Sequence, residues 1–503
     1  MTNRIKRFLP TLFLNMVIVF LGAFIQNGIS LGLLSLITLV GFTQIAILMI
    51  SAYINVLLPI RIIEPSSTTK ITKKRNLSKY LSVLIIIGFI SLAAGYISLF
   101  AALLSLFFYF KDDLKNILFH RQYLKKHLTN IASINAEVCL FISGPAGAAY
   151  QVNQWLPVLE RLNQKCMIVS RRVGICKRLN KTKIPAIYVR SVHDLEQAFN
   201  LNQNLKIVLY PANPMQNAQV LRNLHLQHVF INHGESDKVV NQSKFLLAYD
   251  KLFLAGKLSF DRLISSGLEV RDSQVVYVGR PQAEISLIKN TQSIKIKTIF
   301  YAPTWEGFVD NANYTSIIMF GLKILKEITT KKPNINLIFK PHPYTGIRSE
   351  QTKRALQSIL EYCTAHDITV LSENENIHHG MNQCDLLITD ISSVLNDFLV
   401  TNKPVILCNS LGLSKEQLLQ EYPSSHAAYL LNEHDSIISL VKMIDDTDPM
   451  STEREVVRTY SMGSPHESSL QKFQLAIDQL SKLSSARNST INQNYSLETE
   501  GQK

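Results

Sequence analysis

A charge-free stretch near the start of the chain constrains its fold more than any other feature. From Phe8 to Ile60 there is no Lys, Arg, Asp or Glu. That length is roughly twice the ~20 apolar residues that a helix needs to cross about 30 Å of hydrocarbon. The polar break at Gln26-Asn27-Gly28 predicts two crossings, roughly Phe8 to Phe24 and Leu31 to Leu58. The sequence therefore predicts an N-terminal membrane anchor, within residues 1–112.

A second charge-free stretch spans Tyr80 to Phe110. It fits either one tilted helix or two short helices that meet near Gly95, so three or four crossings remain open. A cleaved signal peptide is the alternative for the first stretch, because Arg4, Lys6 and Arg7 precede it. The apolar run continues without a small-residue cleavage site followed by polar sequence, which favours an anchor.

Three basic segments flank these stretches and predict the orientation of the chain. They are the N-terminus, the loop from Arg61 to Lys79 and the residues after Phe110. Lys and Arg near membrane ends favour the cytoplasmic side. Each apolar block then needs an even number of crossings, so the second block would be a hairpin or a re-entrant element. We expect a multi-pass membrane protein whose region after the second apolar stretch lies in the cytoplasm.

The net charge of +14 is explained by the same segments. Basic residues beside a membrane face anionic lipid, so membrane lipids are expected partners. No basic stretch is interleaved with aromatic residues as in nucleic-acid-binding motifs, and no nucleic-acid partner is expected. The six cysteines show no CxxC spacing and mostly lie in apolar runs, which predicts buried, reduced thiols.

After the anchor the pattern changes to short β-branched runs that alternate with amphipathic stretches, as in parallel βαβ units. With 503 residues the chain is too long for a single core. We predict an α/β fold of two Rossmann-like domains behind the anchor, at residues 113–285 and 286–483. A tail at 484–503, rich in Ser, Asn, Gln and Glu, is predicted to be disordered. The expected strands are 138–143, 167–170, 186–189, 206–210, 228–231, 251–255, 274–278, 298–301, 336–340, 369–371, 386–389 and 405–408.

Polar motifs follow several of these strands, at the ends where open parallel sheets bind ligands. His233, in Ile231-Asn-His-Gly-Glu-Ser-Asp-Lys238, is a candidate general base, because a neutral imidazole can take a proton from a hydroxyl near pH 7. A buried structural histidine is the alternative. Gly144-Pro-Ala-Gly-Ala148 predicts a tight turn into a helix that continues to Leu162. In Val278-Gly-Arg-Pro-Gln282, Arg280 would hold either a phosphate or the linker between the domains.

Three further motifs predict a phosphate site in the second domain. In Tyr301-Ala-Pro-Thr-Trp-Glu-Gly307, Thr304 could approach a phosphate, and Trp305 is interpreted as packing. Lys340-Pro-His-Pro343 combines a cation with a histidine, His342, held between two prolines. Ser392 and Ser393 stand at a predicted helix N-terminus, which favours anions as well as ordinary capping. No cluster of residues has metal-ligand spacing, so neither a cofactor nor a tightly bound metal is expected.

In this order the motifs resemble the CDP-glycerol glycerophosphotransferases of teichoic acid and capsule synthesis over roughly residues 225 to 410. The resemblance implies a phosphotransferase that moves glycerol phosphate, or a similar polyol phosphate, from a CDP-activated donor to a lipid-linked or glycan acceptor. It implies a GT-B-like fold in which the donor lies mainly in the C-terminal domain, and it implies that CMP is released. Two alternative functions remain: a glycosyltransferase that uses another nucleotide-activated donor for capsule or surface glycan, and a catalytically inactive membrane scaffold.

The resemblance also implies roles for matching residues. His233 is the expected base, and Lys340 and His342 are expected to contact the donor phosphates. Thr389, Ser392 and Ser393 are expected to line the same phosphate site, and Asp397 to orient the site or hold the donor polyol. The chain departs from the family at Glu235 and Ser236, where Thr and Pro are common, and at Glu306, where Arg is common. Both departures are expected to place negative charge near the ligand.

Overall fold

The computed structural model describes residues 60–63, 128–238, 243–287, 295–307, 313–372 and 375–500, with side chains from residue 128 to residue 484. The predicted membrane crossings, within 8–58 and 80–110, lie outside these residues. Among the residues that are described, no helix is both long enough and apolar enough to cross a bilayer.

The chain divides into two compact units. The smaller one comprises residues 1–62, 67–133 and 188–201, and its described part includes α9 (Val192–Asn200). A capping box begins this helix: Asp194 N donates to Ser191 Oγ at 3.1 Å, and Ser191 N donates to the Asp194 carboxylate at 2.7 Å. The larger unit comprises 63–66, 134–187 and 202–503, and it contains the candidate site.

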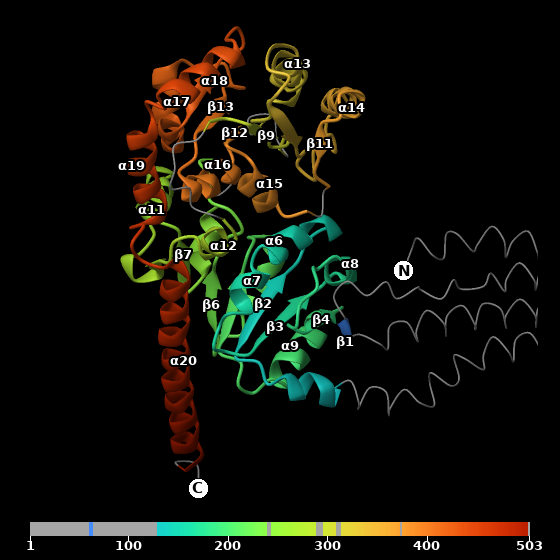
Figure 1. Cartoon of the computed structure of the whole chain (residues 1–503). Coiled ribbons are helices and arrows are strands. Elements are labelled where there is room, and N and C mark those ends of the chain that lie inside the picture. Colours follow the sequence, from blue (N-terminus) through green and yellow to red (C-terminus); the bar gives the residue numbers. More distant parts are fainter. Residues whose placement is uncertain are drawn as a thin grey trace, which may run out of the picture. The chain divides into compact units, whose positions relative to one another are not determined.

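The first sheet has eight strands in the order β1-β4-β3-β2-β5-β6-β7-β8 (Figure 1). The pairs from β3 to β8 are parallel. Central β2 is buried at every position, as expected for a parallel strand that is covered on both faces. The strands are β1 (Ile60–Ile63), β2 (Val138–Ile142), β3 (Cys166–Ser170), β4 (Ala186–Val189), β5 (Ile207–Tyr210), β6 (Gln227–Phe230), β7 (Lys251–Leu254) and β8 (Val275–Tyr277).

The helices of this domain are short. The helix expected to continue to Leu162 is instead a 3-10 turn (Ala146–Ala148), α6 (Ala149–Asn153) and α7 (Leu156–Leu159). Pro157 explains the break, because it has no N–H to donate and its ring crowds the preceding turn. The remaining helices are α8 (Val173–Lys177), α10 (Ala218–Leu221), α11 (Lys257–Ser265) and α12 (Pro281–Ser286).

The second sheet has six strands in the order β11-β10-β9-β12-β13-β14, and all neighbours are parallel. Successive residues alternate between two cores, since Phe300 joins one and Tyr301 the other. The strands are β9 (Thr298–Ala302), β10 (Asn336–Phe339), β11 (Thr369–Val370), β12 (Leu386–Thr389), β13 (Val405–Cys408) and β14 (Tyr429–Leu431).

Helices cover both faces of this sheet, which makes it doubly wound. One core contains residues of α13 (Leu322–Lys331), α14 (Glu350–Ala365) and α18 (Ile437–Asp446). The other contains residues of α15 (Ile377–Gln383), α16 (Ser393–Phe398) and α17 (Lys415–Glu421).

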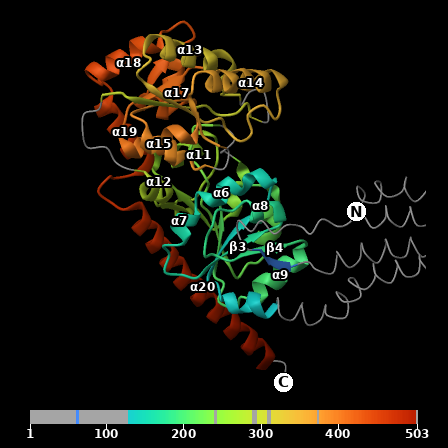
Figure 2. The ribbon, with the colours of Figure 1, turned by 45° about the vertical axis from the view of Figure 1, so that its right-hand side comes forward.

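The last two helices, α19 (Ser451–Met462) and α20 (Ser469–Glu500), correct the predicted C-terminal boundaries. Figures 1 and 2 show α20 beside the first sheet rather than the second. Its Phe473 ring lies 5.2 Å from Trp155 and 5.5 Å from Phe253, between ring centroids. The predicted domain 286–483 therefore ends too late, because the apolar face of α20 is buried against the first domain. The helix also continues through most of the tail for which disorder was predicted, since extending a formed helix adds one hydrogen bond per residue.

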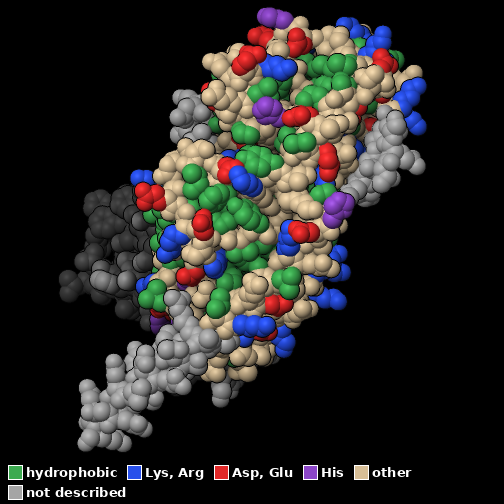
Figure 3. Space-filling view, turned by 90° about the vertical axis from the view of Figure 1, so that its left-hand side faces the viewer, with side chains coloured by type: hydrophobic (Ala, Val, Ile, Leu, Met, Phe, Trp, Pro, Cys, Tyr) green, Lys and Arg blue, Asp and Glu red, His purple; other side chains and the backbone are tan. Residues whose placement is uncertain are grey.

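The predicted fold class of two Rossmann-like α/β domains agrees with these sheets. Every strand predicted between residues 138 and 408 is present, with ends within one residue of the prediction. Two strands were not predicted: β1, which begins at the end of a charge-free run, and β14, a short edge strand. The six cysteines are free, and five of them are buried. On the face seen in Figure 3, side chains of both charges are interspersed, so positive charge is not concentrated there.

Candidate functional site

A cavity of about 490 Å³ lies within the larger unit, and the helices and loops of both domains contribute residues to its wall. It opens where the loops after β6, β9, β10 and β12 meet, as expected for ligand sites beyond the carboxyl ends of parallel strands. Seven of the nine predicted site residues line it: His233, Thr304, Lys340, His342, Ser392, Ser393 and Asp397.

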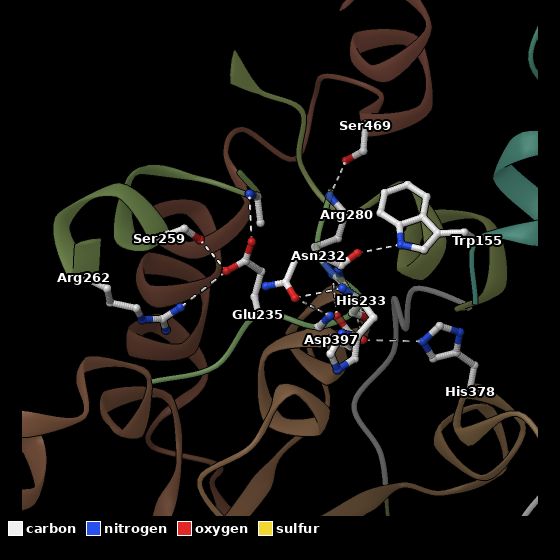
Figure 4. A network of polar contacts seen from close by, with 12 residues as sticks. Trp155, Asn232, His233, Glu235, Ser259, Arg262, Arg280, His378, Asp397 and Ser469 are labelled. Atoms are coloured by element: carbon white, nitrogen blue, oxygen red, sulfur yellow. Dashed lines mark hydrogen bonds and ion pairs between the residues drawn. The ribbon is translucent and has the colours of Figure 1, made fainter. Parts of the chain in front are cut away.

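His233 is held by its neighbours in a defined orientation (Figure 4). The preceding Asn232 has φ 53°, and its side-chain oxygen accepts from His233 N at 2.8 Å. The indole N–H of Trp155 donates to Asn232 O at 2.6 Å. His233 Nδ1 lies 2.9 Å from Pro211 O. A carbonyl can only accept, so Nδ1 carries the hydrogen and Nε2 keeps a free lone pair.

His342 has the opposite arrangement. Its Nδ1 accepts from the backbone N–H of Tyr344 at 3.1 Å, so in the neutral ring the hydrogen is on Nε2. Burial, with a smaller contribution from the charge of Lys238, lowers the pKa of His233 to about 4 and that of His342 to about 3. Both rings are therefore neutral at pH 7. One imidazole can accept a proton at Nε2, and the other can donate a hydrogen bond from Nε2.

An aromatic cluster brings the two histidines together. Tyr150, on α6, lies edge-on to His233 and to His342, with centroid distances of 5.7 and 6.1 Å. Trp305 stacks on His342 at 5.9 Å with an interplanar angle of 15°. A Cβ at Gly147 would lie 2.8 Å from the Tyr344 ring, so glycine permits the close approach of the two loops. Tyr150 was not predicted as a site residue. The only sequence feature that points to it is its position directly after the glycine-rich turn.

Gly234 permits a second close approach, between the His233 loop and α16. A Cβ at this position would lie 2.6 Å from the Cβ of Ser393. Ser392 is the N-cap of α16, yet its hydroxyl makes no hydrogen bond to that helix. The serine pair and the base are thus neighbours on the cavity wall.

Two lysines supply positive charge to the cavity. Lys238 Nζ donates to Thr304 Oγ1 at 2.7 Å. Burial lowers the pKa of Lys238 to about 8, and the nearby Asp390 carboxylate opposes this. Lys340 is nearly buried, and its Nζ donates to Ser372 O. Lys238 stood in a quoted motif but was not singled out, because only the fold brings it next to Thr304.

Arg280 and Asp397 form a buried ion pair that joins the two domains. Arg280 Nε and Nη2 donate to the Asp397 carboxylate at 2.8 and 2.9 Å, and Nη2 also donates to His233 O at 3.4 Å. Burial is the largest single influence and raises the pKa of Asp397, but the charge and hydrogen bonds of Arg280, together with the nearby His378, outweigh it and lower the pKa to about 2. Arg280 does not line the cavity. Of the two roles predicted for Arg280, the structure thus favours a link at the domain junction over a phosphate ligand.

Thr389 does not line the cavity, although its Oγ1 lies 3.5 Å from Oγ of Ser392, which does. It is fully buried, and its hydroxyl donates to Ala302 O at 2.8 Å. This hydrogen bond joins the ends of β9 and β12. The side chain is therefore used to hold two strands in register rather than to face a ligand.

The two carboxylates expected near the ligand are turned away from it. Glu306 accepts hydrogen bonds from the backbone amides of Gly346, Arg348 and Ser349 at 3.0–3.2 Å. Glu235 accepts from Ser259 Oγ at 2.9 Å (Figure 4). Neither residue lines the cavity. The expectation of added negative charge at the ligand is therefore wrong, because these acids satisfy local hydrogen-bond donors.

The site thus combines a free imidazole lone pair with hydrogen-bond donors and cations suited to an anion. Within the described ranges, no group of three or more His, Cys, Asp or Glu residues is placed to hold a metal ion. The arrangement can remove a proton from a hydroxyl and stabilise negative charge on a neighbouring group.

One comparison, with protein-family models, agrees with this chemistry. Residues 259–462 match the family described as CDP-glycerol:poly(glycerophosphate) glycerophosphotransferase. No curated protein is significantly similar to the chain. Among solved structures, the wall teichoic acid polymerase TagF is 13% identical with a TM-score of 0.48, and the match covers 74% of this chain and 98% of that chain. The S. aureus MnaA–UDP structure is 14% identical with a TM-score of 0.42, covering 68% and 95%. At identities of 13% and 14% and TM-scores below 0.5, these two structural similarities do not indicate a function.

Proposed function

From the match of residues 259–462 to the CDP-glycerol:poly(glycerophosphate) glycerophosphotransferase family we propose a specific reaction for the chain. It transfers glycerol phosphate, or a similar polyol phosphate, from a CDP-activated donor to a hydroxyl of a lipid-linked or glycan acceptor. The product extends a cell-surface polymer, and CMP is released.

The opposite tautomers of His233 and His342 are the observation that supports this reaction best. His233 Nε2 has the lone pair that a general base needs, because Nδ1 is committed to Pro211 O at 2.9 Å. His342 Nε2 carries a hydrogen that can be donated to a phosphate oxygen, because Nδ1 accepts from Tyr344 N. Both rings are uncharged at neutral pH, so neither role requires a change of protonation before the reaction.

The chemical step is an attack of the acceptor oxygen on the β-phosphorus of the donor. A phosphorus–oxygen bond forms to the acceptor, while the bond between that phosphorus and the oxygen of CMP breaks. His233 Nε2 takes the acceptor's proton, and the electron pair of the broken bond leaves on CMP. Lys238, Lys340 and the His342 N–H stabilise charge on the phosphates, in a site where burial strengthens such interactions.

We place the enzyme at a bacterial cytoplasmic membrane, with the cavity on the cytoplasmic side. The charge-free stretches and their basic flanks support this location. A nucleotide-activated donor is a cytoplasmic metabolite by its chemistry, and an anchor would hold the cavity near a lipid-linked acceptor. A protease-protection assay on membrane vesicles tests the orientation. Protease should cleave the region after residue 128 in vesicles whose cytoplasmic face is on the outside, and should not cleave it in vesicles of the opposite orientation.

A donor panel tests the proposed activity. Purified full-length protein is given CDP-glycerol, CDP-ribitol or a UDP-sugar with an acceptor mixture, and release of CMP or UDP is measured. CMP release from a CDP-polyol is the expected result. Release from a UDP-sugar alone would make the chain a glycosyltransferase, and release from none would make it an inactive scaffold.

Replacement of the base provides the second arm of this test. His233→Ala should lower kcat by about 10²- to 10⁴-fold, the usual contribution of a general base. His366→Ala is the matched control, since this exposed histidine lies at the end of α14, away from the cavity. Transfer by His233→Ala at the wild-type rate would refute the base assignment.

A further inference from the structure

The loop that follows β6 carries a site residue at each of its two ends. His233, the proposed base, begins it, and Lys238, a cation of the cavity wall, ends it. We call residues 233–238 the base loop, and none of them lies in a helix or a strand. The hydrogen bonds of regular secondary structure therefore do not fix this loop, so its position depends on its side chains.

Two buried carboxylates lie between the ends of the base loop. Glu235 is 8% exposed and Asp237 is 5% exposed. Glu235 accepts from Ser259 Oγ at 2.9 Å and from Ala255 N at 3.4 Å. Asp237 accepts from Ser424 N at 3.0 Å and also from the Ser424 hydroxyl. A buried carboxylate is costly unless a cation compensates its charge. The base loop therefore needs positive charge behind it, on the side away from the ligand.

Arg262, on α11, supplies this charge to both carboxylates. Its Nη1 lies 3.9 Å from Glu235 Oε2 (Figure 4), and its Nη2 forms a closer ion pair with Asp237. The Arg262 side chain is itself only 10% exposed. A guanidinium presents several donors in a rigid plane, so it can hold two carboxylates at once, whereas an ammonium is a single point of charge.

The base loop is thereby held from both domains. Asp237 is bound by Arg262 of the first domain and by Ser424 of the second, between α17 and β14. At the other end of the loop, Arg280 Nη2 donates to His233 O at 3.4 Å. Arg262 thus holds the half of the loop that Arg280 does not contact.

The surroundings of Lys238 show what the position of the base loop controls. Lys238 Nζ donates to Thr304 Oγ1 at 2.7 Å and lies 5.4 Å from the centre of the Tyr314 ring. The titratable groups around this ammonium are Tyr314, Asp390, His233 and His342. A loop that moved away from α11 would break these contacts and return the ammonium to water.

We propose that Arg262 is a positioning residue, which seats the base loop so that His233 and Lys238 reach the ligand from one rigid segment. Arg262 does not line the cavity of about 490 Å³, so it acts through Glu235 and Asp237 rather than on the ligand. The roles of His233 and Lys238 in this inference rest on the proposed function. The inference also explains why a loop that faces an anionic ligand contains two acids.

Arg262→Gln tests this role in the full-length protein. We expect kcat for CMP release to fall about 10- to 100-fold, because a displacement of about 1 Å can cost about 10²-fold in rate. The alkaline limb of kcat/KM should move upward by about one pH unit or more. Burial lowers the pKa of Lys238 to about 8, and a displaced loop would relieve that burial.

Lys257→Gln is the matched control on the same helix. Lys257 is exposed, and its ion pair with Asp261 at 3.0 Å lies within α11 and does not involve the base loop. This variant should keep kcat within about twofold of wild type and the alkaline limb in place, since exposed pairs contribute little.

A double variant keeps the test valid if Arg262→Gln alone fails to fold. Arg262→Gln with Asp237→Asn removes one charge of each sign, so the net charge of the buried cluster is unchanged. If the two residues act as one unit, the double variant should lose about as much kcat as either single variant. A loss equal to the product of the two single losses would show that Arg262 does not act through Asp237, and would overturn the proposal.

NMR of [15N]histidine-labelled protein gives a readout that needs no substrate. In wild type the His233 ring should carry its hydrogen on Nδ1, facing Pro211 O, whereas Arg262→Gln should show a mixture of tautomers. An upward shift of the limb or a mixed His233 signal supports the proposal. A variant that loses only thermal stability, with the limb and the His233 signal unchanged, makes Arg262 a purely structural residue. Failure of the proposed function is distinguishable, because wild type would then release no CMP while the His233 signal would still change in the variant.

Discussion

The two sides of the cavity differ in chemistry and in how their residues are held. The second domain offers an imidazole N–H, hydroxyls and a lysine, all following strands of one parallel sheet. The first domain offers His233, Lys238, carboxamides and one arginine, on α6 and in the segments that follow α6, α8 and β6. Two of the three cations that line the cavity among the described residues, Arg178 and Lys238, thus come from the first domain, and the third, Lys340, comes from the second. The difference teaches that the positive charge around the ligand is divided between the domains, while the serine pair and the imidazole N–H donor come from the second domain alone.

The Arg280–Asp397 ion pair joins the two sides, and breaking it should have the largest effect on stability. Asp397→Asn leaves the Arg280 charge buried without its partner, which costs about 3–5 kcal/mol of unfolding free energy. Thermal or denaturant unfolding of the purified protein measures this loss. Glu350→Gln is the control, because its exposed pair with Lys353 should contribute less than about 1 kcal/mol. Equal small losses in both variants would show that the buried pair does not link the domains.

The hydrogen-bond donor of His342 belongs to the phosphate side. His342→Ala removes the Nε2–H and should lower kcat about 10²- to 10³-fold, as for other preorganised donors to a developing anion. His342→Gln keeps an N–H donor and should recover part of this loss. Steady-state CMP release measures both rates. The same rate for Ala and Gln would mean that the ring acts by packing against Trp305 rather than by donating.

The lowered pKa of Lys238 predicts that activity falls at alkaline pH. Its pKa is lowered to about 8, so the ammonium is present below pH 8 and is lost as the pH rises through that value. Affinity for the anionic donor should therefore fall up to about tenfold for each pH unit above 8. Lys238→Arg keeps its charge at every accessible pH and should remove this limb from the profile of kcat/KM. An unchanged limb in that variant would assign it to another group.

Tyr150 tests how much the first domain contributes to the orientation of the histidines. Tyr150→Leu removes both edge-on contacts and should lower kcat by up to about tenfold, since such contacts contribute about 0.5–1.5 kcal/mol each. Tyr150→Phe retains the ring and should lie within about twofold of wild type. A large loss in Tyr150→Phe would instead indicate a role for the phenol hydroxyl.

Much of the fold could be predicted because the sequence features that indicate each strand lie within a few residues of it. The runs of β2, β9 and β12 are almost purely apolar and are bounded by glycine or polar turns, which identifies buried parallel strands. His233, His342 and Ser392 could be placed at one ligand site because each follows such a strand, and parallel strands end on the same edge.

The remainder depends on contacts between residues that are distant in sequence. Asp397 lies 117 positions from Arg280, and no local pattern indicates that the two form a pair. Glu306 appears as a free carboxylate until the loop after β10 brings backbone amides onto it. Phe473 likewise reads as part of the second domain, although its ring packs against the first.

The division of labour between the two histidines is the central claim, and solid-state NMR of the full-length protein labelled with [15N]histidine tests it most directly. His233→Gln and His342→Gln assign the two signals at pH 7. The structure predicts two neutral rings of opposite tautomer, with the hydrogen on Nδ1 of His233 and on Nε2 of His342. The same tautomer in both rings, or a protonated imidazolium at either position, would contradict the account.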